Sequence, residues 1–257
     1  MYGLFLVALI LFLATPCEGK YETRKFDSVV SSNFSSLAYD ARGTPMIAYN
    51  DHSELKLVRC TDPGCLNQLS PVVIDQFTGS EMGLFVDMIT HPVAGNPCLA
   101  YLMKSTAGSK VKISCCATQD CRGVIYRHEI DTARDFTSED EYLVSVDIVK
   151  QIDGNGSNTY HPLVAYNSNS NGLRVSFCHD FSCTERTLNN IANVDLTSVK
   201  LIVHGGLPSL FYNKDDKVSN CRCSDTSCSS CATNLTEIYE GQSSVAYVFP
   251  PFFSILL

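Results

Sequence analysis

Short hydrophobic runs separated by polar turns fill most of this 257-residue chain, and their spacing predicts β-strands. Four of the runs have similar composition and each would begin a structural unit. They are SSLAYD at 35–40, LFVDMI at 84–89, VSVDIV at 144–149 and TSVKLIV at 197–203. No stretch keeps the 3.6-residue hydrophobic period of a helix. The sequence therefore predicts an all-β protein.

A longer pattern recurs four times after these runs. Each copy has a proline, a tyrosine four positions later, a polar loop, and then two cysteines five positions apart. The copies are Pro45–Cys65, Pro97–Cys121, Pro162–Cys183 and Pro208–Cys228. A further, more variable strand follows each copy, at 71–77, 124–130, 186–191 and 236–241. Four short strands per unit, at intervals close to the length of one blade, predict a β-propeller-type array.

The predicted blades cover residues 35–82, 83–141, 142–195 and 196–241, and residues 242–257 would begin an incomplete fifth blade. Residues 25–30 resemble an outer strand that could help to close a ring. The middle strands of a closing blade are missing, however, because the chain reads PPFFSILL and stops. We therefore expect a truncated or imperfectly closed propeller, and we favour truncation.

The first 19 residues have the apolar core and the small-residue cleavage site of a secretory signal peptide. The apolar run is too short to favour a membrane span. The predicted mature chain, residues 20–257, would be a single secreted, extracellular domain. Its formal charge is negative, −8 for the full sequence, and no basic patch stands out. This charge argues against nucleic acid and against an anionic membrane surface as partners.

Thirteen cysteines are present, and twelve remain after Cys17 leaves with the signal peptide. An even number in an oxidising compartment predicts disulfides, and a turn brings two cysteines five positions apart within bonding distance. Zinc is the alternative, but it favours closer spacing and four converging ligands. The predicted pairs are Cys60–Cys65, Cys116–Cys121, Cys178–Cys183, Cys223–Cys228, Cys98–Cys115 and Cys221–Cys231. Three glycosylation sequons, at Asn33, Asn155 and Asn234, fit the same compartment.

Several repeated or clustered side chains are candidates for chemistry. The tyrosines of the repeat, at 49, 101, 166 and 212, could stack on a ligand, but buried aromatic packing is the better interpretation. His91, His161 and His204 all fall between the first and second strands of their units and are weak candidates for a metal site. The loop 153–158 resembles half of a calcium loop, whereas a glycosylated loop is the simpler explanation. We predict no cofactor and no bound metal.

The repeats resemble those of secreted, cysteine-stapled β-propeller proteins. The residues that carry this resemblance are the Pro-x-x-Ala-Tyr motif and the Cys-x4-Cys motif that follows it. Turns with aspartate at 62, 180 and 225 also resemble, distantly, the Asp-box turns of sialidase-like propellers, although the chain contains no tryptophan. The resemblance implies a non-catalytic module that binds an extracellular protein or glycan through loops on one face. Candidate contacts in the loops after each tyrosine are Asp51, Glu54, Asp215 and Asp216. A sialidase-like glycoside hydrolase and a non-functional truncated fragment are the alternatives.

Overall fold

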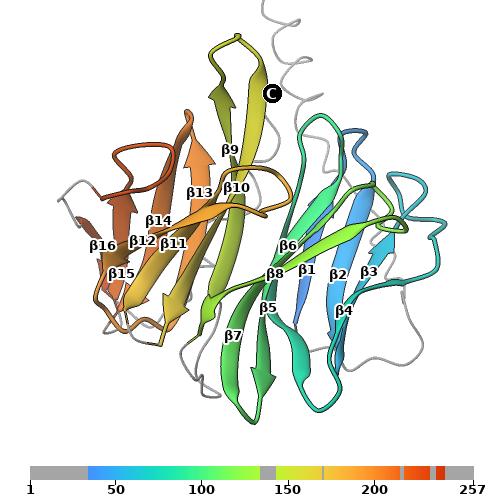
Figure 1. The fold of residues 1–257 in the computed structure, drawn as a ribbon, viewed down its shortest axis with the longest axis horizontal. Coiled ribbons are helices and arrows are strands. Elements are labelled where there is room, and N and C mark those ends of the chain that lie inside the picture. Colours follow the sequence, from blue (N-terminus) through green and yellow to red (C-terminus); the bar gives the residue numbers. More distant parts are fainter. Residues whose placement is uncertain (1–33, 134–142, 170, 215–216, 232–235, 241–257) are drawn as a thin grey trace, which may run out of the picture. The chain divides into compact units, whose positions relative to one another are not determined.

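Four antiparallel sheets of four strands each make up the protein in its computed structural model, which describes residues 34–133, 143–169, 171–214, 217–231 and 236–240 (Figure 1). The strands of each sheet are consecutive in the chain, as an array of propeller-type blades requires. The first sheet contains β1 (Ser35–Tyr39), β2 (Pro45–Asp51), β3 (Glu54–Arg59) and β4 (Val72–Gln76). The second contains β5 (Glu81–Thr90), β6 (Pro97–Ser105), β7 (Gly108–Cys116) and β8 (Ile125–Thr132).

The third sheet contains β9 (Val144–Ile152), β10 (Asn158–Ser168), β11 (Gly172–Cys178) and β12 (Arg186–Ala192). The fourth contains β13 (Ser198–His204), β14 (Leu207–Lys214), β15 (Lys217–Arg222) and β16 (Thr236–Glu240). The all-β prediction is therefore confirmed, as are the four units of four strands. Residues 1–19, 25–30 and 242–257, to which the sequence assigned a signal peptide, an outer strand and a fifth blade, lie outside the described residues. Among the described residues, no helix has the length and apolar character that crossing a membrane requires.

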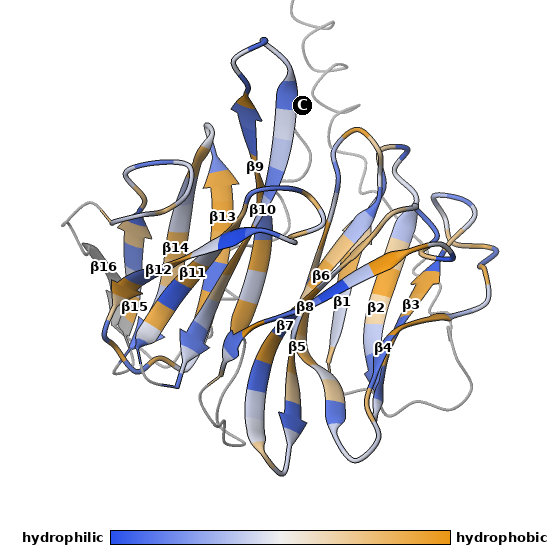
Figure 2. Ribbon diagram, viewed as in Figure 1, coloured by the Kyte–Doolittle hydropathy of each residue, from blue (hydrophilic) through white to orange (hydrophobic). Residues whose placement is uncertain are grey.

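Both faces of the inner strands of the second sheet are buried, because this sheet lies between the first and the third. In β6, Leu99 and Tyr101 pack with residues of the first sheet, whereas Ala100 and Leu102 on the opposite face pack with residues of the third. This two-sided burial explains why the central strands read as nearly continuous hydrophobic runs. Figure 2 shows the contrast with the tip of the β9–β10 hairpin, which is hydrophilic. The core therefore consists of layers between successive sheets.

The first strands of successive sheets contact one another in order, β1 with β5, β5 with β9, and β9 with β13. Polar side chains join these strands at their backbones. Asp87 of β5 accepts a hydrogen bond from the backbone N–H of Val146 in β9 at 3.0 Å. Asp147 of β9 likewise accepts one from the N–H of Val203 in β13 at 2.6 Å. These strands belong to different sheets and are not paired backbone to backbone, so aspartate side chains accept the N–H groups instead.

Six disulfides form within the described residues, and they join the same pairs of cysteines that the spacing predicts. Each bond lies within one sheet. The four Cys-x4-Cys turns have a common backbone geometry, in which the second cysteine has a positive φ of 52° to 58°. Its N–H donates to the carbonyl three residues earlier, an oxygen of Asp62, Thr118, Asp180 or Asp225. Because non-glycine residues rarely take positive φ, a repeated positive φ marks one turn used four times.

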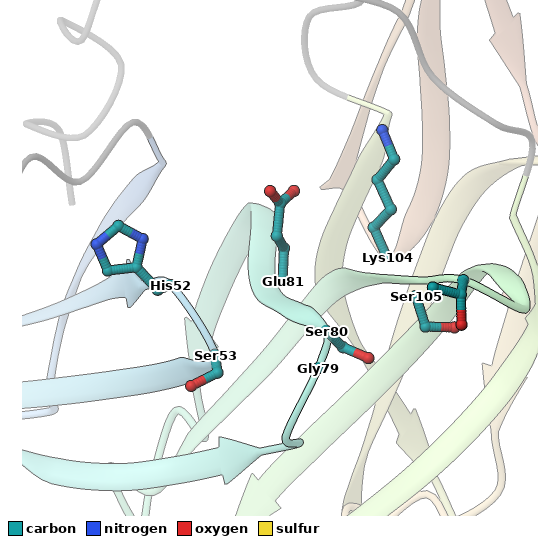
Figure 3. A pocket seen from close by; sticks show the side chains of 8 residues that line it. His52, Ser53, Gly79, Ser80, Glu81, Lys104 and Ser105 are labelled. Carbon is teal, nitrogen blue, oxygen red and sulfur yellow. The ribbon is translucent and has the colours of Figure 1, made fainter.

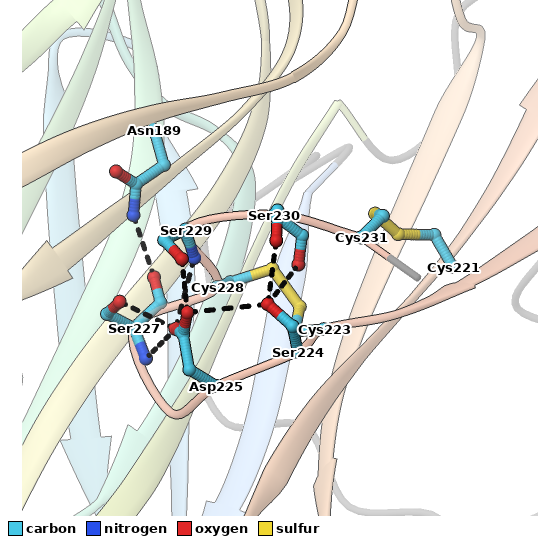
Figure 4. The surroundings of a disulfide bond; sticks show 10 residues. All are labelled: Asn189, Cys221, Cys223, Ser224, Asp225, Ser227, Cys228, Ser229, Ser230 and Cys231. Carbon is cyan, nitrogen blue, oxygen red and sulfur yellow. Dashed lines mark hydrogen bonds between the residues drawn. A yellow bond between two sulfur atoms is a disulfide. The ribbon is translucent and has the colours of Figure 1, made fainter. Parts of the chain in front are cut away.

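The aspartate of these turns accepts hydrogen bonds from the turn that it begins, and Asp225 shows this most fully (Figure 4). Its carboxylate accepts the backbone N–H groups of Ser227 at 2.9 Å and Ser229 at 3.1 Å, together with both serine hydroxyls. Burial alone would raise the pKa of Asp225, but these donors outweigh it and lower the pKa to about 2. The aspartate therefore holds the backbone of the turn in place.

The repeat tyrosines are buried, as the core interpretation predicts: Tyr101 and Tyr166 are fully buried, Tyr212 is 1% exposed and Tyr49 is 6% exposed. Each lies opposite a fixed position of the next strand. That position holds Lys56, Lys112 and Arg174 in the first three sheets and Ser219 in the fourth. The repeat therefore has a fifth element, a cross-strand partner for tyrosine, that the sequence pattern did not reveal.

An aspartate from the preceding sheet completes this pair in two places. Asp75 of β4 accepts a hydrogen bond from the Tyr101 hydroxyl at 2.6 Å and forms an ion pair with Lys112. Only 8% of the Asp75 side chain is exposed, so the charge is compensated inside the interface. Burial, and then the charge of Asp75, raise the pKa of Tyr101, which keeps its hydroxyl protonated as a donor.

Asp131 of β8 repeats the arrangement between the second and third sheets. It accepts from the Tyr166 hydroxyl at 3.1 Å and lies 2.5 Å from a guanidinium nitrogen of Arg174. Between the third and fourth sheets, Ala192 of β12 stands where the aspartate would be. Asp75, Asp131 and Ala192 each pair with the residue that precedes the lysine or arginine opposite the tyrosine of their own sheet. At this interface alanine replaces the aspartate and Ser219 replaces the lysine or arginine, and the Tyr212 hydroxyl is hydrogen-bonded to Ser219.

Candidate ligand-binding site

Two of the loops that follow the repeat tyrosines meet at one pocket of about 500 Å³ (Figure 3). The β2–β3 turn contributes His52 and Ser53, and the end of β6 with the first residue after it contributes residues 104–106. A third segment, residues 79–81 at the start of β5, lies between them. The sequence predicted that the loops after the tyrosines share a face, and these two loops line a common pocket.

Backbone contacts fix the β2–β3 turn at the edge of this pocket. His52 has a positive φ of 53°, which closes a two-residue turn between the strands. The His52 carbonyl accepts the N–H of Met82 at 2.9 Å, and the Ser53 carbonyl accepts the N–H of Phe77 at 3.2 Å. The turn of the first sheet is thereby attached to the start of the second. A site that bridges two sheets in this way is formed before any ligand arrives.

Opposite charges and hydroxyls line the pocket. Glu81 and Lys104 are directly paired in the β5–β6 ladder, and Figure 3 shows their side chains extending in the same direction. Ser80 is 8% exposed, and its hydroxyl has no hydrogen-bond partner among the residues that the structure describes. The Ser80 oxygen is shielded from solvent, so the charged groups that a ligand can reach are those of Glu81 and Lys104, which are both exposed. The pocket can therefore donate to and accept from a polar ligand at several points.

The predicted acidic contacts lie beside this pocket and do not line it. Asp51 and Glu54 flank the β2–β3 turn, and both form ion pairs with Lys56, the one from Glu54 at 3.0 Å. Those ion pairs raise the pKa of Lys56 further above its usual value, so the ammonium group stays charged. Asp215 and Asp216 lie outside the described residues. A ligand role for these four acids stays a prediction.

Sequence reasoning missed Ser80, Glu81 and the histidine of the turn. The segment 79–81 lies outside the repeated Pro-to-Cys pattern, and it reaches the pocket only because the second sheet packs beside the first. Gly79, with a φ of +81°, was the one local signal of a tight connection there. A search restricted to the repeat could not find Ser80 and Glu81, whereas His52 lies inside the first copy.

The three candidate metal histidines have separate surroundings. His161 uses both ring nitrogens, with Thr159 at 2.9 Å and the Cys178 carbonyl at 3.1 Å. The Nδ1 of His91 accepts the N–H groups of Val93 and Ala94, at 3.2 Å and 3.0 Å. His204 is exposed at the end of β13. Within the described residues, no group of three or more histidine, cysteine, aspartate or glutamate side chains is placed to hold a metal ion.

The segment that resembles half of a calcium loop is a hydrogen-bonded hairpin turn between β9 and β10. The Asp153 carboxylate accepts the N–H groups of Asn155 at 2.9 Å and Ser157 at 2.8 Å. The carboxylate is thus used by the turn itself. Asn155 is exposed at the tip, where a glycan would fit, whereas Asn33 and Asn234 lie outside the described residues.

A second group of acids lies on the first strands of the sheets. Asp87 lies 2.9 Å from Lys200 of β13 and 2.8 Å from the hydroxyl of Ser145. Burial raises the pKa of Asp147 to about 6, while hydrogen bonds from Val203 and Ile148 oppose the rise. An acid that titrates near neutral pH is what general acid catalysis needs. Both carboxylates nevertheless accept backbone N–H groups, which is the behaviour of structural residues.

Comparison with known proteins gives distant structural likeness and no family. No family model matches the chain, and no curated protein matches it. Among solved structures, the chain is similar to a leech intramolecular trans-sialidase complexed with 2,7-anhydro-Neu5Ac, at 10% identity and a TM-score of 0.44. The match covers 84% of this chain and 53% of that one, so the chain spans about half of the neighbour's length. We draw no functional conclusion from so distant a likeness.

Proposed function

We propose that the protein is a secreted, non-catalytic binding module that recognises a glycan, or a protein, through the pocket between the β2–β3 and β6–β7 turns. The observation that carries the proposal is the pair of exposed side chains Glu81 and Lys104, which lie opposite each other in the β5–β6 ladder and line the pocket. Hydroxyl, carboxylate and ammonium groups around a concave surface suit a ligand rich in hydroxyls. A glycan is therefore favoured over a flat protein surface.

Secretion is supported by the six disulfides, since such bonds persist in oxidising compartments. Rigid sheets that carry turns of different composition are a common design for recognition. The two turns at the pocket differ in sequence while the strands around them repeat, which is consistent with selection of a ligand at the turns.

The test is binding of the purified, disulfide-bonded chain to a glycan array and to an array of extracellular proteins. Glu81→Ala should weaken binding to the best glycan by about 5- to 10-fold, the value of one hydrogen bond to the ligand. Its thermal stability should change little, because Glu81 is exposed. Lys104→Ala should weaken binding further, whereas Arg42→Ala, which changes an exposed cation in the β1–β2 turn, should leave it unchanged.

Unchanged glycan binding by Glu81→Ala and Lys104→Ala would refute the site, and binding to proteins alone would show that the ligand is a protein and not a glycan. Glycoside hydrolysis is the second candidate, favoured by the raised pKa of Asp147. A screen with fluorogenic glycosides separates the two functions. Turnover that is lost in Asp147→Asn would show that the protein is an enzyme.

A further inference from the structure

A second pocket, of about 460 Å³, lies between the second and third sheets. It is formed by the turn after β5, the start of β10 and the Cys178–Cys183 turn, and its main side chains are His91, Tyr160, His161, His179, Asp180 and Phe181. In an antiparallel sheet these turns are at the opposite end of the strands from the β2–β3 and β6–β7 turns. The second pocket is therefore separate from the first.

Aromatic rings give this pocket its shape. The His91 ring contacts Tyr160 and Phe181 edge to face, with centroids 4.8 Å and 4.9 Å apart. His161 stacks on Phe177 with ring centroids 5.3 Å apart, and Phe177 meets His179 in a T-shaped contact at 5.2 Å. Such pairs hold one another in place as well as excluding water. The rings come from two sheets, so the pocket depends on how the sheets pack.

The walls are fixed before a ligand binds. Phe181 lies inside a disulfide-closed turn, and His161 is held through both ring nitrogens. His91 is held by two backbone N–H groups, which assigns its proton to Nε2. A pocket whose side chains are already immobilised loses little conformational entropy on binding.

The charge of the pocket limits what it can bind. No lysine or arginine lines it, and Asp180 is its one acid. Burial would raise the pKa of Asp180, but donors led by the Ser182 hydroxyl lower it, so the carboxylate is charged. Burial also lowers the pKa of His91, which is therefore neutral at pH 7. An anionic ligand would meet a negative charge with no cation to compensate it.

From the rings, the polar groups and the charge, we propose that this pocket is a second binding site, for a neutral sugar residue such as a hexose or an N-acetylhexosamine. The apolar C–H face of the sugar packs on Phe181 and Tyr160. Its hydroxyls bond to the Asp180 carboxylate, to His179 and to the exposed side chain of Asn158. The proposal does not depend on the first pocket, because the two share no residue.

The test is titration of the full disulfide-bonded chain with methyl β-galactoside, methyl α-mannoside, N-acetylglucosamine and N-acetylneuraminic acid, followed by NMR. At least one neutral sugar should shift resonances of the pocket, and the anionic sugar should not. Phe181→Ala should weaken binding of the neutral sugar by about 3- to 10-fold, which is the contribution of one aromatic contact. Phe77→Ala, which removes an aromatic ring that is 56% exposed at the other end of the strands, is the matched control.

Asn158→Ala changes an exposed side chain and so tests the pocket even if Phe181→Ala fails to fold. Glu81→Ala should leave this binding unchanged, which separates the second site from the first. Absence of binding by every neutral sugar, preference for N-acetylneuraminic acid, or equal affinity in the Phe181 and Asn158 variants would each overturn the proposal.

Discussion

The contact between Asp75, Tyr101 and Lys112 should contribute more to stability than any other polar contact of a repeat tyrosine. Tyr101→Phe removes a hydroxyl that bonds a charged acceptor at 2.6 Å and the Ser114 hydroxyl at 2.8 Å, in a fully buried place. A hydrogen bond to a charged group contributes about 1.5–3 kcal/mol, so we expect a loss of about 2 kcal/mol. Asp75→Ala also leaves Lys112 without its buried acid, and should cost about 3–5 kcal/mol.

The chain contains its own control for this prediction. Tyr212 has the same position in the fourth sheet, but Ala192 stands where the aspartate would be, and its hydroxyl bonds Ser219. Tyr212→Phe therefore removes a bond between neutral groups and should cost about 0.5–1.5 kcal/mol. Urea unfolding of the oxidised protein at neutral pH measures these losses.

A double-mutant cycle of Asp75→Ala and Tyr101→Phe isolates the contact itself. Because the two groups touch, the double variant should be about 1–2 kcal/mol more stable than the sum of the single losses predicts. Equal losses for Tyr101→Phe and Tyr212→Phe, or strictly additive effects in the cycle, would refute the idea that the aspartate joins the two sheets through the tyrosine.

Three further predictions concern pH and the disulfides. Burial raises the pKa of Asp147 to about 6 from 3.8, so its protonated form stabilises the fold below pH 4 and this stability is lost as pH rises through 6. Between pH 4 and pH 7, Asp147→Asn should therefore lose about 1–2 kcal/mol less unfolding free energy in urea than the parent protein does. Equal losses in the two proteins would contradict this prediction. The pKa of Asp225 is lowered to about 2, so the stability that its carboxylate gives the fold is present above pH 4 and is lost as pH falls towards 2. Asp225→Ala should therefore destabilise the protein by about 1–2 kcal/mol at pH 7 and by little near pH 2, which thermal melts at both pH values measure. Replacing Cys98 and Cys115 together by alanine should cost about 3 kcal/mol, because their bond closes a loop of 17 residues; a loss no larger than that for a five-residue turn would argue against a chain-entropy origin.

The candidate site was only partly predictable from the sequence. The loops after the tyrosines differ in sequence between the copies, and two of them line a pocket. The acids in those loops were less informative, since Asp51 and Glu54 are already paired with Lys56. Ser80 and Phe181 gain their positions from packing between sheets, and no local pattern distinguishes a serine or a phenylalanine that lines a pocket from one that does not.

The sequence by itself determined the strands, the turns and the cysteine pairs. These depend on residues close together in the chain: a strand needs a hydrophobic run, and a Cys-x4-Cys turn closes on itself with Asp225 or its equivalents holding the backbone. The tertiary structure decided which side chains of different sheets meet. Asp75 contacts Tyr101 across 26 positions, and His91 contacts Phe181 across 90, because the sheets pack face to face. Contacts of that kind depend on the distance between sheets and on the facing of each strand, which no run of neighbouring residues specifies.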